Sequence, residues 1–229
     1  MNSGHATRTR ARKYLVIACN IMKEELLRLE TNGISFVFLE QSLHRTPQKM
    51  KEVIQGEIDR ADETWDGDAI VLSYGLCSNG IVGVKSKRNT IVIPRAHDCI
   101  SLFLGSPSKY LEEHGKEPGT YYLTKGWIEE GKSPLGIYRE YVPRYGEETA
   151  EWVIREELKN YARIALIDTG LGLKETHREH AKENARFLNL RYEEIRGSLE
   201  FFEKMLKGIW ERDFVLLKPG EEVTQDLFL

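Results

Sequence analysis

The residues best suited to chemistry in this sequence are its three cysteines, Cys19, Cys77 and Cys99. Each follows a short apolar run typical of a β-strand. The carboxyl ends of parallel strands share one edge of a sheet, so we expect the three thiols to converge there despite their separation in sequence. Three thiolates could together hold a metal ion or an iron–sulfur cluster. The alternative is that one or more of them is a buried core residue.

The segment before Cys99 carries three further polar side chains that could take part in a reaction. His97 lies two residues from the thiol and could act as a ligand or as a general acid or base. Asp98 could orient the imidazole of His97 without binding the metal itself. Arg95 could lower the pKa of a thiol or bind an anionic substrate, and an ordinary salt bridge is its competing role.

Glycines and a later strand end supply candidate cofactor-binding positions. Gly75 and Gly80 flank Cys77 in a turn where the backbone could approach a ligand closely. Asp168 and Gly170 follow another predicted strand, and the turn at 170–172 could cradle a phosphate at the start of a helix. A plain helix-start turn is the competing interpretation, because no complete glycine-rich fingerprint surrounds it.

Other polar residues are less specific. Gln41 and His44 follow the second predicted strand and therefore reach the same edge of the sheet. His177 and His180 are three residues apart on a charged helix, where a solvated face is the simpler interpretation than a metal site.

An α/β fold must position these residues. Short apolar strands alternate with amphipathic helices, which is typical of a mainly parallel sheet with helices on both faces. We predict two Rossmann-like βαβ halves joined by an irregular middle segment. The strands are expected at 14–18, 34–39, 69–74, 90–93, 163–167, 190–195 and 214–217.

The predicted organisation has four parts. Residues 1–13 form a flexible basic leader, and residues 14–103 form an N-terminal α/β half that contains the three cysteines. Residues 104–150 are rich in Gly, Pro and Tyr and are interpreted as a loop-rich excursion, either a lid over the cysteines or an insertion on the surface. Residues 151–229 form a C-terminal α/β half.

Composition excludes several classes of protein. The net charge of the 229-residue chain is −3, with both signs mixed throughout, so we expect no nucleic-acid partner. No apolar run is long enough to span a membrane, and the basic leader lacks the apolar region of a secretory signal. An odd number of distant cysteines argues against a disulfide framework and favours a cytoplasmic protein with reduced thiols.

Three segments, Ser73–Gly80, Pro94–Cys99 and Pro118–Trp127, resemble a prokaryotic domain-of-unknown-function family of anaerobes and methanogens with YGLC-x-NG and PRAHDC blocks. The resemblance covers nearly the whole chain and implies an anaerobic context near corrinoid methyl-transfer systems. By analogy, the three thiols are similar to those of quinolinate synthase and thiouracil desulfidase, which hold a [4Fe–4S] cluster by three cysteines. The His97-x-Cys99 pair also resembles half of the ligand set in zinc methyltransferases, although here the other cysteines precede it.

Three functions therefore remain open. The first is an enzyme with a three-cysteine [4Fe–4S] cluster whose open iron acts on a small polar substrate, as a lyase, dehydratase or desulfurase. The second is a zinc site of Cys and His ligands for thiol or methyl transfer. The third is a non-catalytic metal- or cofactor-binding accessory protein whose partner is a corrinoid methyl-transfer protein. A homo-oligomer is compatible with all three.

Overall fold

The larger of two β-sheets carries the cysteines. The computed structural model describes residues 13–29 and 31–228, so the leader predicted over 1–13 lies, except for Lys13, outside the described residues. The strand order is β2-β1-β3-β4-β8, with the first four strands parallel and β8 antiparallel to β4. β1, β3 and β4 are buried along their whole length, which explains their continuous apolar sequences. The strand bounds are β1 Tyr14–Cys19, β2 Ile34–Leu39, β3 Ala69–Ser73, β4 Ile91–Pro94 and β8 Phe214–Leu217.

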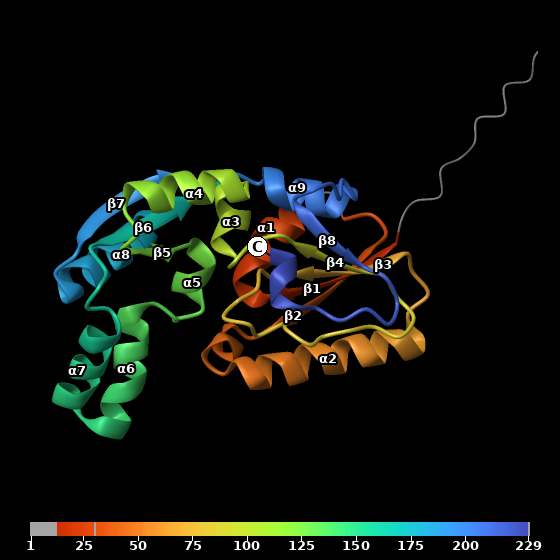
Figure 1. Cartoon of the computed structure of the whole chain (residues 1–229). Helices are drawn as coiled ribbons and strands as arrows, with labels where there is room; N and C mark the ends of the chain where they lie inside the picture. The colour runs from red at the N-terminus through yellow and green to blue at the C-terminus, as the bar shows by residue number, and fades with distance from the viewer. Residues whose placement is uncertain (1–12, 30, 229) are drawn as a thin grey trace, which may run out of the picture.

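Helices cover both faces of this sheet (Figure 1). On one face lies α2, which buries Met50, Ile54 and Ile58 at the four-residue spacing of a single helix side. On the other face lies α9, whose Phe202 and Met205 are fully buried. The mainly parallel α/β fold predicted from the sequence is confirmed. The helices that accompany this sheet are α1 Lys23–Arg28, α2 Pro47–Thr64, α3 Ile100–Leu104 and α9 Glu200–Lys207.

A smaller sheet forms a second lobe. Its three strands are all parallel, in the order β5-β6-β7, and it has a hydrophobic cluster of its own. The strands are β5 Thr120–Leu123, β6 Arg163–Asp168 and β7 Arg191–Arg196, and the helices are α4 Pro107–Lys116, α5 Lys125–Glu129, α6 Pro134–Tyr145, α7 Glu147–Glu157 and α8 Glu175–Leu188.

The two lobes do not follow the predicted boundaries. The predicted middle segment contributes β5 to the smaller sheet, and the predicted C-terminal half returns β8 to the larger one. Strand pairing joins segments that are distant in sequence, so local patterns could locate these strands but not their partners.

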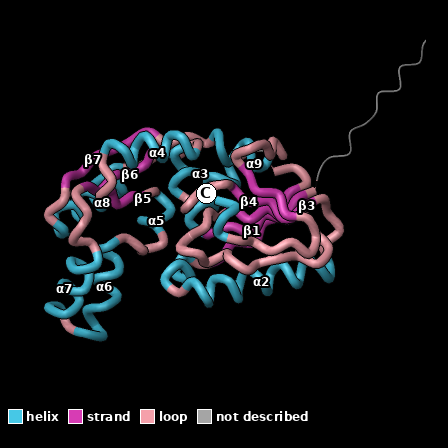
Figure 2. Tube along the Cα trace, viewed as in Figure 1, coloured by secondary structure: helices cyan, strands magenta, loops and turns pink. Residues whose placement is uncertain are grey.

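The segment 104–150, expected to be loop-rich, is mostly helical (Figure 2). Two serines and a threonine of this segment are helix caps. Ser106, Thr124 and Ser133 accept hydrogen bonds from the backbone N–H groups of Lys109, Trp127 and Gly136, respectively, and a proline opens two of these three helices. Ser-Pro pairs mark helix starts as readily as turns, which explains the difference.

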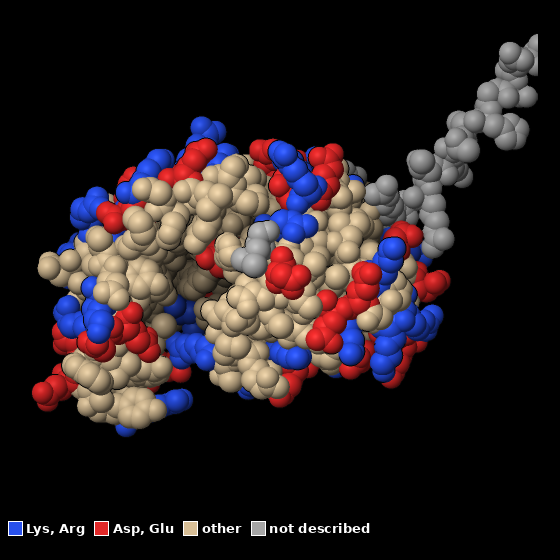
Figure 3. Space-filling view, in the orientation of Figure 1, with Lys and Arg blue, Asp and Glu red and all other residues tan. Residues whose placement is uncertain are grey.

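The surface is hollowed between the two lobes (Figure 3). Trp127 of α5 packs against the hydrophobic clusters of both lobes and so joins them. No helix in the described part of the chain is both long and apolar enough to cross a membrane.

Candidate functional site

All three cysteines lie at the carboxyl edge of the larger sheet. Cys19 is the last residue of β1, and Cys77 and Cys99 lie in the loops after β3 and β4. These two loops run side by side, because the Cys77 N–H donates to the His97 carbonyl at 2.9 Å. All three thiols are free and buried. The sheet therefore brings the three sequence-predicted thiols to one edge.

The pKa values of the three thiols are governed by their burial. Burial is the main cause that raises the pKa of Cys19 to about 12 and raises the pKa of Cys77 and Cys99. Cys19 adds to the rise for Cys77, and Cys77 and Cys19 add to the rise for Cys99. The buried Tyr74 lies among them, and all three cysteines contribute to raising its pKa after burial itself. Backbone N–H groups of Gly75 and Cys99 lower the pKa of Cys77, so they lie near its sulfur.

The Cys77 loop has an unusual backbone. Cys77, Ser78 and Asn79 have φ angles of 47°, 55° and 65°, three consecutive left-handed residues with side chains. Such a run is costly for L-residues, and backbone strain of this kind is concentrated at functional sites. The turn closes through a 3.0 Å bond from the Gly80 N–H to the Cys77 carbonyl.

The glycines predicted to contact a cofactor meet protein atoms instead. A Cβ at Gly75 would lie 2.7 Å from both the Ala96 carbonyl oxygen and the Asp98 nitrogen. At Gly80 the nearest atom would be the Met50 sulfur, at 2.7 Å. Both glycines therefore let the Cys77 turn pack against its neighbours.

A pocket of about 800 Å³ opens beside the thiols, between the two lobes. Cys77, Cys99, His97 and Asp98 line it from the larger sheet. The remaining lining residues are Gln41, His44, Ser78 and Ile100 from the first lobe, and Tyr110, His114, Pro118, Gly119, Thr120, Tyr121, Tyr122, Trp127, Asn160 and Tyr161. The segment predicted as a lid thus supplies much of the wall facing the cysteines. Cys19 is not among the lining residues.

Three residues of this pocket carry buried polar atoms that lack a hydrogen-bond partner. They are Oε1 of Gln41, Nε2 of His44 and the hydroxyl oxygen of Tyr122. Burial lowers the pKa of His44 to about 4, so its imidazole is neutral at pH 7. Its ring centroid lies 5.9 Å from that of Tyr74, which connects it to the thiol cluster. The sequence predicted that Gln41 and His44 lie at the carboxyl edge of the sheet, but it indicated no chemical function for either of them.

Asp98 is held in place within the pocket wall. Its Oδ1 accepts a 2.9 Å hydrogen bond from the Ile100 N–H. Burial raises its pKa, whereas the Ile100 N–H, His97 and the Tyr110 hydroxyl act in the opposite direction. Tyr110 comes from α4, beyond the predicted N-terminal half. Sequence reasoning placed this tyrosine in a lid, but it had no signal that it would pair with Asp98.

Arg95 has a structural role in this arrangement. Its Nε donates to the Arg212 carbonyl at 3.0 Å, and its NH1 group donates to the Leu227 carbonyl. It is not among the residues that line the pocket, so the structure does not place it beside a substrate there.

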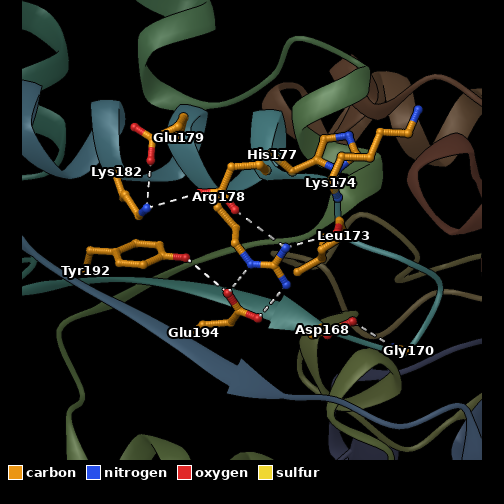
Figure 4. A network of polar contacts seen from close by, with 11 residues as sticks. Asp168, Gly170, Leu173, Lys174, His177, Arg178, Glu179, Lys182, Tyr192 and Glu194 are labelled. Atoms are coloured by element: carbon orange, nitrogen blue, oxygen red, sulfur yellow. Dashed lines mark hydrogen bonds and ion pairs between the residues drawn. The ribbon is translucent and has the colours of Figure 1, made fainter.

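Asp168 and Gly170 lie at the end of a different sheet. Oδ1 of Asp168 accepts a 2.9 Å hydrogen bond from the Gly170 N–H, which fits a simple turn after β6 (Figure 4). Both residues line a separate groove at the carboxyl edge of the smaller sheet, together with Arg196 and Ser198. The structure therefore does not bring them together with the cysteines.

His177 and His180 also have structural partners. The Lys174 N–H donates to Nδ1 of His177 at 3.0 Å, and Nε2 of His180 lies 2.8 Å from the Ser133 hydroxyl.

The donor side chains of the described residues do not form a site for a single metal ion. Over residues 13–29 and 31–228, no group of three or more His, Cys, Asp or Glu side chains is arranged to hold a single metal ion. An iron–sulfur cluster binds each cysteine through a different iron, so its thiolates stand farther apart than the ligands of one ion. Thiols with backbone N–H groups near a sulfur, as at Cys77, are the kind of donor that such a cluster takes.

Comparison with known proteins gives a family and no function. A search of curated proteins and a search of solved structures each found no match. Residues 38–206 match the model of a family described as protein of unknown function (DUF1638). The matched range includes all the residues that line the pocket, Cys77 and Cys99 among them, and it begins after Cys19. The resemblance to a domain-of-unknown-function family is thus confirmed, and the chain belongs to the DUF1638 family.

Proposed function

We propose that this protein is a metalloenzyme that holds an iron–sulfur cluster through Cys19, Cys77 and Cys99 and acts on a small polar substrate in the adjoining pocket. The observation that carries the proposal is the pocket itself. It combines two of the three thiols with His97 and Asp98 on one wall and aromatic residues of the second lobe on the other. Pockets of this size and mixed lining are typical of sites for small molecules.

The thiols fit the chemistry of the cluster in two respects. Thiolate is the ligand that iron–sulfur clusters take, and hydrogen bonds to the sulfurs help to set their properties. Cys77 has backbone N–H groups of Gly75 and Cys99 near its sulfur. An iron with an open coordination position, when bound, would supply Lewis acidity toward an oxygen or nitrogen of the substrate.

The chain's own polar residues would bind the substrate and move protons. His97 is exposed at the pocket wall, where its imidazole would act as a general acid or base toward a substrate. Its carbonyl is fixed by the Cys77 N–H, which holds the residue beside the thiols. Asp98 is fixed by the Ile100 N–H and lies near the Tyr110 hydroxyl, so it is a positioning residue for this wall.

The second lobe would exclude water from the reacting groups. Trp127, Tyr121 and Tyr122 face the same volume as Cys77 and Cys99. Enclosure by aromatic residues lowers the local dielectric and strengthens polar interactions with a substrate. This supports a lyase, dehydratase or desulfurase type of reaction over a metal centre that only carries electrons.

Two experiments test the assignment. We expect protein purified without oxygen to contain iron and acid-labile sulfide and to show a broad visible absorption that bleaches on reduction. Cys77→Ser and Cys99→Ser should each lose most of the iron while the circular dichroism spectrum is retained. Ser101→Ala is the matched control, because Ser101 is buried two residues after Cys99 but does not line the pocket.

The alternatives give different results. About one zinc per chain without sulfide would favour the zinc site for thiol or methyl transfer. Iron and sulfide with no turnover of any small substrate would favour an accessory protein of a methyl-transfer system. Full retention of iron in both cysteine variants would refute the ligand assignment.

A further inference from the structure

The unpartnered polar atoms are concentrated at one place. Four buried side-chain nitrogen or oxygen atoms lack a hydrogen-bond partner among the described residues, and three of them belong to residues that line the inter-lobe pocket. A buried polar group without a partner costs about 1–3 kcal/mol, so three at one site call for an explanation. A ligand that provides the missing hydrogen bonds is such an explanation.

The three atoms define what the ligand must offer. Oε1 of Gln41 can only accept a hydrogen bond, so it requires a donor. Nε2 of neutral His44 can accept or donate, according to its tautomer, and the Tyr122 hydroxyl can do both. The Thr120 hydroxyl donates to the Glu117 carbonyl and accepts from Nε of Arg163, and it lies near enough to the Tyr122 hydroxyl to lower the pKa of Tyr122. The ligand must therefore carry a donor, and an acceptor on it would satisfy the hydroxyl proton of Tyr122.

The charges of the pocket disfavour an anionic ligand, because the only basic side chains that line it are the imidazoles of His44, His97 and His114. Among the described lining residues none is Lys or Arg, and the only carboxylate is that of Asp98. Arg95, the nearest candidate in sequence, is turned to the carbonyls of Arg212 and Leu227. A phosphate or carboxylate would enter without a fixed positive charge to pair with it, which is unfavourable in a partly buried site.

The walls favour a flat molecule. Tyr110 and Tyr122 have ring centroids 6.5 Å apart, and Tyr121 and Tyr161 meet edge to face at 5.7 Å. Together with Trp127 they make five aromatic side chains around one pocket. Aromatic rings bind planar groups by offset stacking or by edge-to-face contact.

We propose that the inter-lobe pocket binds an uncharged, planar nitrogen heterocycle, such as a nucleobase, a nucleoside or nicotinamide. Such rings present N–H donors and C=O acceptors on one edge and an apolar face to aromatic walls. The volume of about 800 Å³ leaves room for an uncharged substituent such as a sugar. This inference names the substrate class of the proposed metalloenzyme and rests on that function for its catalytic meaning, while the binding itself needs only the pocket.

Matched pairs of probes test separately whether the ligand must be uncharged and whether its polar edge must carry N–H donors. Binding to the full chain, purified without oxygen, is measured by calorimetry and ligand-observed NMR for uracil against orotate, and for nicotinamide against nicotinate. At least one neutral member should bind at millimolar concentration, and its anionic partner about tenfold more weakly, or about 1.4 kcal/mol. A third probe, 1,3-dimethyluracil, lacks N–H donors and should bind more weakly than uracil.

Variants locate the binding site. Gln41→Leu and Tyr122→Phe each remove one unpartnered atom and should weaken binding of the neutral probe about fivefold, the effect of one hydrogen bond. Trp65→Phe is the matched control, since Trp65 carries the fourth unpartnered atom but does not line the pocket. Thermal unfolding verifies that each variant is folded before binding is compared.

The outcomes separate this inference from the proposed function. Selective binding of a neutral heterocycle by protein without iron would support the pocket assignment and refute the cluster. Iron and sulfide in a protein that binds none of the neutral probes would refute the heterocycle proposal alone. Equal or tighter binding of the anionic members, or equal loss of affinity in Trp65→Phe, would also overturn it.

Discussion

Glu25 is a buried carboxyl group whose ionisation should limit the stability of the protein above neutral pH. It lies in α1, is 2% exposed, and accepts a 3.1 Å hydrogen bond from the Thr169 hydroxyl of the second lobe. Burial is the main cause that raises its pKa from the ordinary value of 4.5 to about 7. The adjacent Glu24 raises it further, whereas Lys125 and the Thr169 hydrogen bond lower it.

The raised pKa of Glu25 makes the stability of the folded protein fall as the pH rises. Because the folded state holds the proton more tightly than the unfolded state, Glu25 contributes most to stability below pH 4.5. That contribution is lost as the pH rises from 4.5 to about 7, and it stays lost at higher pH. The difference between pKa values of 4.5 and about 7 corresponds to about 3 kcal/mol.

Glu25→Gln keeps the shape of the side chain and an acceptor for Thr169 but cannot ionise. We expect it to raise the free energy of unfolding at pH 8 by about 1–3 kcal/mol and to change it little at pH 4. Urea denaturation followed by circular dichroism at both pH values measures the difference. Glu24→Gln is the control, since Glu24 is half exposed and its ion pair with Lys125 contributes about 1 kcal/mol at most. The reasoning is refuted if Glu25→Gln has the same effect at pH 4 and pH 8, or if it destabilises the protein at pH 8.

Two further predictions concern the backbone around Cys77. Gly75→Ala should destabilise the protein by about 1–3 kcal/mol, because the new Cβ would lie 2.7 Å from backbone atoms of residues 96 and 98. Gly56→Ala, in the middle of α2 with nothing within 4 Å, should stabilise it by about 0.5–1 kcal/mol, and denaturant titration of both variants gives the comparison. Ser78→Gly should stabilise the protein by up to about 1 kcal/mol, because glycine adopts the φ of 55° without steric cost, whereas Ser78→Val should destabilise it. If Ser78→Val stabilised the protein, the inference that the backbone of this turn is strained would be wrong.

Sequence by itself determined the fold class and the edge at which the thiols lie. The strands that carry the cysteines are continuous apolar runs, and their burial in a parallel sheet follows from that pattern. Parallel strands share their carboxyl edge whatever their separation in sequence, so Cys19, Cys77 and Cys99 had to reach it together. His97 and Asp98 were found at the pocket for the same reason, because they belong to the loop that ends in Cys99.

Tertiary structure alone decided what faces the thiols. The pairing of β5 with β6 places Tyr121 and Tyr122 opposite Cys77, and the helix α4 brings Tyr110 to Asp98. Arg95 looked suited to bind an anion, yet carbonyl groups more than a hundred residues away hold it. Hydrophobic period and capping residues are local in sequence, so they can be recognised in one segment at a time. Which distant segment fills the space beside a side chain depends on the packing of the whole chain, and that packing placed Cys77 and Cys99 in the wall of a pocket.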